Sequence, residues 1–170
     1  MRKNLKAFGN MINMRQILIG LTVLLLGTLV YLIDRSPDQT YFVEKSFVNI
    51  SLHNILPNLF GFVGSSLPSF IHVFSFILIT AGLLHWQKKG CIFICACWFI
   101  VDCTFELGQK FNLWSSKITP DWFNGILFLE NTKTYFIRGT FDYFDLAAIT
   151  LGAISAYFVL SHTIQMEKVS

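Results

Sequence analysis

Charged residues are scarce in this chain of 170 residues. Only 14% of the residues are Asp, Glu, Lys or Arg, and 54% are hydrophobic, whereas about 25% of the residues of a soluble domain are charged. The formal net charge is only +3, and no basic stripe is interleaved with aromatic residues as nucleic-acid binding requires. The composition therefore argues against a soluble domain and against a nucleic-acid partner. It predicts a polytopic membrane protein whose main partner is the lipid bilayer.

The motifs of several enzyme classes are also absent. The sequence contains no HExxH, no GxSxG and no phosphate-binding loop. No two of its cysteines have the spacing of a zinc or redox motif, and we interpret them as buried apolar side chains: Cys91, Cys95, Cys97 and Cys103. We therefore expect no metal and no cofactor, and the sequence leaves open whether the chain is an enzyme.

Hydropathy predicts an all-α membrane protein with four transmembrane helices in one domain, residues 16–162. The expected spans are residues 16–33, 68–86, 91–108 and 141–160. The second span would begin at Pro68, because proline is accepted in a first helical turn.

Two further stretches complete the predicted organisation. Residues 46–67 are apolar but interrupted by Asn, Gly and Pro, which predicts an interfacial or re-entrant segment. Residues 110–140 would form a long loop, with Trp114 and Trp122 as interfacial anchors.

The distribution of basic residues predicts the orientation. The N-terminal residues 1–15 carry four basic residues, and Lys88 and Lys89 lie in a short turn between the second and third spans. Because short cytoplasmic segments are enriched in Lys and Arg, residues 1–15 and the tail 163–170 are both expected in the cytoplasm.

Ionisable residues inside the expected spans predict a functional site. Asp102 and Glu106 are four residues apart and share one face of a helix, and an unpaired carboxylate in hydrocarbon is strongly unfavourable. With the predicted orientation, His72 lies near the outer end of its span, at the same level as the polar residues of the third and fourth spans. The candidate ligand-binding residues are His72, Asp102, Glu106, Gln109, Arg138, Asp142 and Asp145.

Several roles are open for these candidates. His72, Glu106 and Asp145 could form an acid–base set or bind a divalent cation, without a diagnostic spacing for either. Arg138 could bind a phosphate group. Asp142 could simply favour the positive end of a helix dipole, in the first turn after Thr140 as the N-cap.

Three stretches of the sequence resemble the VanZ-like family of small bacterial membrane proteins. They are Pro68 to His72 with the aromatic residues that follow, Glu106 to Phe111 as an E-x-x-Q-x-F element, and Arg138 through Asp145 to Gly152. Ser69 stands where relatives often have a lysine. The resemblance implies a multi-pass protein of the bacterial cytoplasmic (inner) membrane. Some relatives are linked to resistance to the glycopeptide teicoplanin, but the resemblance implies no particular reaction.

Two functional hypotheses follow, with a third ranked below them. In the first, the candidate residues bind a phosphorylated, lipid-linked or otherwise polar envelope ligand at the outer leaflet. In the second, the polar residues only join helices, and the chain is a non-catalytic subunit or assembly partner of a larger membrane protein complex. Its last span carries small residues that allow close helix approach: Ala147, Ala148, Gly152, Ala153, Ser155 and Ala156. A proton or ion pathway ranks last, because residues 91–100 are apolar.

Overall fold

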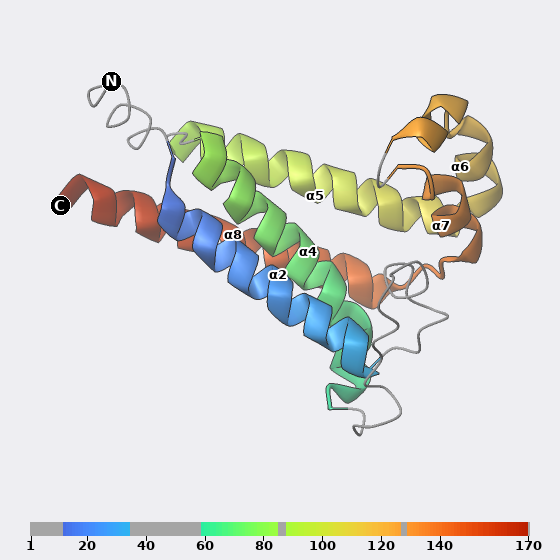
Figure 1. The fold of residues 1–170 in the computed structure, drawn as a ribbon, viewed down its shortest axis with the longest axis horizontal. Coiled ribbons are helices and arrows are strands. Elements are labelled where there is room, and N and C mark those ends of the chain that lie inside the picture. Colours follow the sequence, from blue (N-terminus) through green and yellow to red (C-terminus); the bar gives the residue numbers. More distant parts are fainter. Residues whose placement is uncertain (1–11, 35–58, 85–87, 127–128, 170) are drawn as a thin grey trace.

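The computed structural model describes residues 12–34, 59–84, 88–126 and 129–169. This part of the chain is helical and contains no strand (Figure 1). The helices are α2 (Met14–Asp34), α4 (Gly61–Leu84), α5 (Lys88–Lys110), α6 (Asn112–Ile118), the 3-10 helix η2 (Asp121–Gly125), α7 (Thr132–Arg138) and α8 (Tyr143–Val169).

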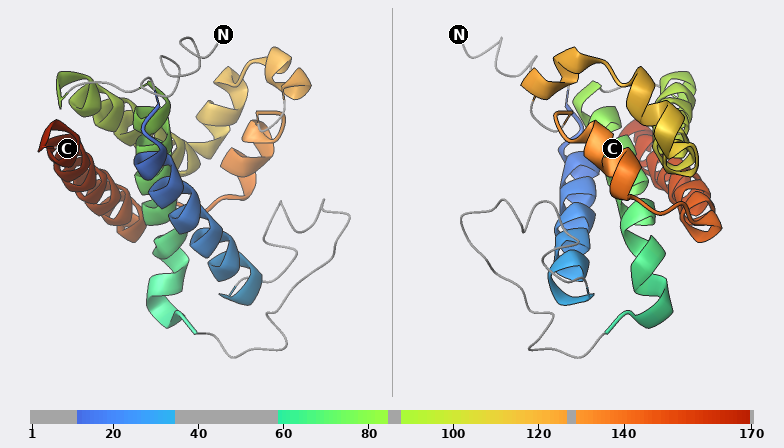
Figure 2. Two further views of the ribbon diagram at one scale, coloured as in Figure 1. Left: turned by 60° about the vertical axis from the view of Figure 1, so that its left-hand side comes forward. Right: turned by 90° about the vertical axis from the view of Figure 1, so that its right-hand side faces the viewer.

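The four long helices run in alternating directions. In Figure 1, α2 and α5 run one way and α4 and α8 the other, so α2 begins at the end of the bundle where α8 finishes. The three short elements α6, η2 and α7 lie beyond the opposite end, where α5 ends (Figures 1 and 2). This arrangement places an even number of long helices between the two ends of the described chain.

Three helices are long and apolar enough to cross a membrane: Val63–Leu84, Lys89–Lys110 and Tyr143–Gln165. The shortest of these spans has 22 residues, or about 33 Å at 1.5 Å per residue, which matches a hydrocarbon core of about 30 Å. The apolar part of α2, Met14–Val30, is shorter. The all-α fold of a multi-pass membrane protein is therefore present, with three such helices plus the shorter apolar one.

Helix α4 begins at Gly61, seven residues before the expected start at Pro68, which lies inside the helix. The expectation of a separate interfacial or re-entrant segment is wrong for residues 61–67, and residues 46–58 lie outside the described residues. The physical reason is that hydrocarbon offers no water to backbone groups, so a helix continues through Gly, Ser and Pro that would end it in water.

Two other boundaries differ from the expectation. Lys88 and Lys89 belong to the first turn of α5 and not to a turn between helices. Residues 110–140, expected as a loop, contain the three short helical elements α6, η2 and α7.

Close contacts between helices occur at glycine residues. A Cβ atom on Gly27 of α2 would lie 2.7 Å from Ile71 Cγ2 of α4, and one on Gly152 of α8 would lie 2.5 Å from Val73 Cγ1. Both distances are too short for real Cβ atoms. Helix α4 is therefore the central helix, with α2 packed against it at Gly27 and α8 at Gly152, and its residues Val73, Ile77 and Leu78 are fully buried.

A chain of neutral hydrogen bonds, here called the neutral lock, joins three helices where α2 begins. Asn13 caps α2 through its Oδ1, which accepts from Gln16 N (3.1 Å), and its own backbone N donates to Gly82 O of α4 (2.8 Å). Gln16 Nε2 donates to Thr163 Oγ1 of α8 (2.8 Å), and Thr163 Oγ1 donates to Leu160 O (3.0 Å). The side chains of the lock are buried.

Candidate functional site

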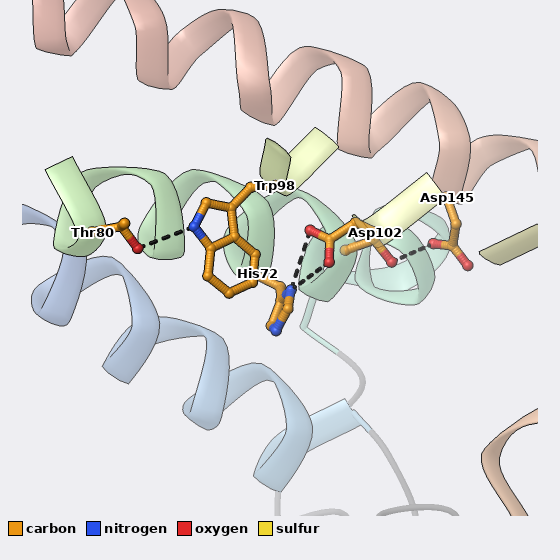
Figure 3. A network of polar contacts seen from close by, with 6 residues as sticks. His72, Thr80, Trp98, Asp102 and Asp145 are labelled. Carbon is orange, nitrogen blue, oxygen red and sulfur yellow. Dashed lines mark hydrogen bonds and ion pairs between the residues drawn. The ribbon is translucent and has the colours of Figure 1, made fainter. Parts of the chain in front are cut away.

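A histidine–aspartate pair joins α4 to α5. His72 Nδ1 lies 3.1 Å from Asp102 Oδ1 and 3.3 Å from Asp102 Oδ2 (Figure 3). About half of the His72 side chain is exposed (48%), whereas only 10% of the Asp102 side chain is. Asp102 thus has its ionisable partner inside the protein, while the far side of the imidazole faces outward.

Aromatic rings separate this pair from the end of the bundle that holds the neutral lock. The Phe76 ring lies 4.4 Å from the His72 ring and 4.9 Å from the Trp98 ring, measured between centroids. Trp98 Nε1 in turn donates to Thr80 Oγ1 (3.0 Å), again between α5 and α4 (Figure 3). Ionisable groups therefore stop at His72 and Asp102 along the α4–α5 contact, and neutral aromatic packing follows.

The first turn of α8 adds two carboxylates. Asp145 Oδ1 accepts a hydrogen bond from Ser69 Oγ of α4 (3.0 Å). Asp142 Oδ1 accepts from Phe144 N (2.9 Å), so Asp142 is itself the N-cap of α8. The expectation that Thr140 caps this helix, with Asp142 in its first turn, is wrong, because α8 begins only at Tyr143.

Glu106 connects α5 to the start of α8. This buried carboxylate accepts the backbone N–H of Asp142 through Oε1 (2.8 Å), and its Oε2 accepts from Gln109 Nε2 (3.5 Å). In a capping box, a glutamate at the third helical position binds the N-cap N–H in this way. Here a glutamate from a neighbouring helix binds it, so the position of α8 depends on α5.

We call these contacts together the polar centre, which is formed by Ser69, His72, Asp102, Glu106, Gln109, Asp142 and Asp145. Three helices contribute to it, α4, α5 and α8, and it contains four carboxylates but only one group that can become cationic. Within the described ranges, Lys133 forms an ion pair with Asp121, and His72 forms one with Asp102 when its imidazole is protonated.

The structure brings together six of the seven predicted site residues. The exception is Arg138, which ends α7 with an exposed side chain and forms no ion pair with these carboxylates in the described part of the chain. The expected depth of His72 also changes, because eleven residues of α4 precede it. Ser69, three residues before His72, contacts the first turn of α8. His72 therefore lies about one helical turn deeper in the bundle than the first turn of α8.

Ser69 is the member of the polar centre that sequence reasoning did not select. It precedes His72 by three residues, which places both on one face of α4. That spacing was available from the sequence, but a lone serine in an apolar helix carries little signal of its own. Trp98 and Phe76, which border the centre, were likewise not selected.

The arrangement can bind protons, hydrogen-bond donors or cations. An imidazole that donates Nδ1–H to Asp102 presents Nε2 as a free acceptor, which is the state of a general base. In the residues described, no group of three His, Cys, Asp or Glu side chains is arranged to hold a metal ion.

Comparisons with family models, with curated proteins and with solved structures found no match for this chain.

Proposed function

We propose that this chain is a VanZ-like integral membrane protein of the bacterial cytoplasmic membrane, whose polar centre binds an envelope ligand from the outer leaflet. The observation that carries the proposal is that ionisable side chains of three apolar helices are directed at polar groups of a neighbouring helix: Asp145 toward Ser69, Asp102 toward His72 and Glu106 toward the start of α8. Ionisable groups inside a membrane are rare and mark ligand or ion sites.

In this proposal α2 is a fourth transmembrane helix, with both termini in the cytoplasm. Its 21 residues measure about 32 Å along the helix axis. It packs on α4 through Gly27, and its other face exposes leucines that suit lipid contact: Leu18, Leu21, Leu25, Leu26 and Leu29. Four antiparallel crossings return the chain to the side on which it began, and the basic N-terminal segment favours the cytoplasm.

The charge of the polar centre favours one kind of ligand. Four carboxylates with a single histidine attract an ammonium group or hydroxyl donors, whereas they repel a phosphate. A phosphate would instead be drawn to Lys110 and Arg138, whose side chains are exposed and are not part of the polar centre. We therefore propose a ligand whose amine or hydroxyl groups enter the centre, and we place any phosphate that it carries outside.

The alternative of an assembly partner has less support. The small residues Gly152 and Ala156, which could have received a helix of another protein, are buried within this chain, and Gly152 contacts α4. An ion pathway also lacks support, because the Phe76 and Trp98 rings follow the last ionisable pair of the α4–α5 contact.

Isosteric neutralisation tests the proposal. The chain is produced in a glycopeptide-susceptible bacterium, and the minimal inhibitory concentration of teicoplanin is measured together with the amount of membrane-inserted protein. Asp145→Asn keeps the acceptor oxygen for Ser69 Oγ, and Glu106→Gln keeps the acceptor oxygen for the backbone N–H of Asp142 but gives up the long bond from Gln109 Nε2. Both variants remove the charge. We expect both variants to insert normally and to lower resistance to the level of the host alone.

Two controls accompany these variants. Glu130→Gln removes an exposed carboxylate from the connector between α5 and α8, and Arg138→Gln removes an exposed guanidinium group that is not part of the polar centre. Both variants should retain the resistance of the unmodified chain. The proposal is wrong if the two centre variants also retain it, and the ligand chemistry is wrong if Arg138→Gln abolishes it.

A further inference from the structure

The connector between α5 and α8 has apolar side chains outside and small polar ones inside. On α6, Leu113, Trp114 and Ile118 are exposed, and 65% of Trp114 is accessible. The buried residues of this helix and its end are Ser115, at 4% exposure, and Thr119. A short helix at a water-exposed surface has the opposite pattern.

The polar residues of the interior do not need water. Thr119 Oγ1 donates to Ser115 O (2.7 Å), and Thr132 Oγ1 donates to Leu129 O (2.7 Å). Phe136 is also buried, and its ring contacts Gly108 of α5. The connector is therefore a folded unit that packs against the end of α5. Its exposed apolar residues do not belong to its own interior.

Trp122 continues the exposed apolar surface beyond α6. It belongs to η2, is 64% exposed and packs against Phe123, with 4.5 Å between ring centroids. We call this surface the apolar cap, formed by Phe111, Leu113, Trp114, Ile118 and Trp122. Along the chain, Phe111 alone separates this surface from α5.

We propose that the apolar cap lies in the interfacial region of the same bilayer that α5 crosses, with its tryptophans at the level of the lipid head groups. Asn112, where α6 begins, is only two residues from the end of a transmembrane segment. The cap therefore starts within the 5–10 Å zone where interfacial helices bury their apolar faces. Tryptophan is the residue that favours this zone, because its ring is apolar while its N–H is polar.

Charge around the apolar cap complements lipid phosphates. Residues 110–140 carry four basic and two acidic residues. Lys110 and Lys117 are exposed beside the apolar side chains, and Lys110 Nζ is held by Tyr143 Oη (3.2 Å) and lies 4.9 Å from the centroid of the Phe141 ring. A lysine fixed between aromatic rings at the end of a span places its cation at the boundary between hydrocarbon and head groups. This inference requires that α5 crosses the membrane, but it does not depend on the polar centre.

Tryptophan quenching by brominated phospholipids tests the location. The full chain is reconstituted in phosphatidylglycerol–phosphatidylcholine vesicles, at most one chain per vesicle, so that a second copy cannot cover the surface. Lipids brominated near the carbonyl end of the acyl chain report shallow depth, and those brominated near the terminal methyl report the bilayer centre. The chain contains four tryptophans, of which Trp98 is expected to be deep, so Trp114→Phe with Trp122→Phe should remove most of the shallow-quenched emission and little of the deep-quenched emission.

Trp98→Phe is the matched control, since Trp98 packs between α4 and α5 and should contribute to deep quenching. The inference is overturned if Trp114 and Trp122 resist both lipids and are quenched by aqueous iodide, because the surface then faces water. It is equally overturned if they resist lipids and iodide alike, because a protein segment then covers them. Loss of the teicoplanin phenotype plays no part in this test, so it can fail or succeed independently of the proposed function.

Discussion

The two ends of the helix bundle are held together by different chemistry. At one end, the neutral lock joins α2, α4 and α8 with amide, hydroxyl and backbone groups, all buried and none ionisable at neutral pH. At the other end, the polar centre joins α4, α5 and α8 with four carboxylates and a half-exposed histidine. The first end shows that this chain can fix helices without charge. Helix packing alone therefore does not require the ionisable groups of the second end. Their presence there is the main reason to infer a functional site.

The largest expected effect comes from replacing the charged pair by apolar residues. His72→Phe combined with Asp102→Leu should lower teicoplanin resistance to the level of the host alone, because the acid–base pair is lost. Asp102 is buried although His72 is half-exposed, and replacing a buried ion pair by apolar side chains is often neutral or stabilising, so the apparent melting temperature in detergent should not fall.

The matched control is His162→Phe, which removes an exposed histidine of α8 near the neutral lock. It should leave both readouts unchanged. A double variant that melts far below the unmodified chain would show that the charged pair is structural, and the contrast between the two ends would fail.

A smaller effect is expected in the neutral lock. Gln16→Leu removes the donor to Thr163 Oγ1 and should reduce the free energy of unfolding by about 0.6 to 1.7 kcal/mol, the usual range for an interhelical hydrogen bond in a membrane. Resistance per inserted molecule should be unchanged. Thermal denaturation in detergent measures the loss, with Gln165→Leu, an exposed glutamine of α8, as the control. A loss of resistance at normal protein levels would contradict the division of roles.

The smallest effect is expected outside both ends, at the ion pair of the connector. Lys133 Nζ donates to Asp121 Oδ1 (2.6 Å), and this hydrogen bond lowers the pKa of Asp121 below its ordinary value of 3.8. The stabilisation from a lowered carboxyl pKa is present above the ordinary pKa and is lost as the pH falls through the lowered one.

Asp121 is fully exposed to solvent, and exposed ion pairs contribute little, so Asp121→Asn should leave the melting temperature at pH 7 unchanged within error. The difference between variant and unmodified chain should vanish altogether in strong acid. Melting curves recorded between about pH 2 and about pH 7, a range that brackets the titration of a carboxyl group, measure this difference in melting temperature. A drop at pH 7 as large as that of Gln16→Leu would be unexpected.

The sequence was sufficient for the long helices and for most of the polar centre. Asp102 and Glu106 were identifiable because carboxylates are conspicuous in an apolar stretch, and their four-residue spacing places them on one face. The sequence was insufficient at α4, because the glycines, serines and proline of residues 61–68 disfavour a helix in water, whereas the helix runs through them.

Partner choice could not be predicted from local pattern. Arg138 was expected near Asp145 because the two are close in sequence, but α7 ends with Arg138 on the exposed surface. Ser69 instead contacts Asp145 from 76 positions away. Such a pairing depends on how α4 and α8 pack at Gly152, and a single sequence does not specify that packing.

The bond between Glu106 and the backbone of Asp142 joins positions 36 residues apart. The start of α8 is therefore positioned by a helix that leaves the ribosome earlier. A nascent chain that stops before residue 142 contains Glu106 with its N–H donor still unsynthesised. The polar centre is thus complete only after α8 has been synthesised, and a ligand that needs all three helices can bind only then.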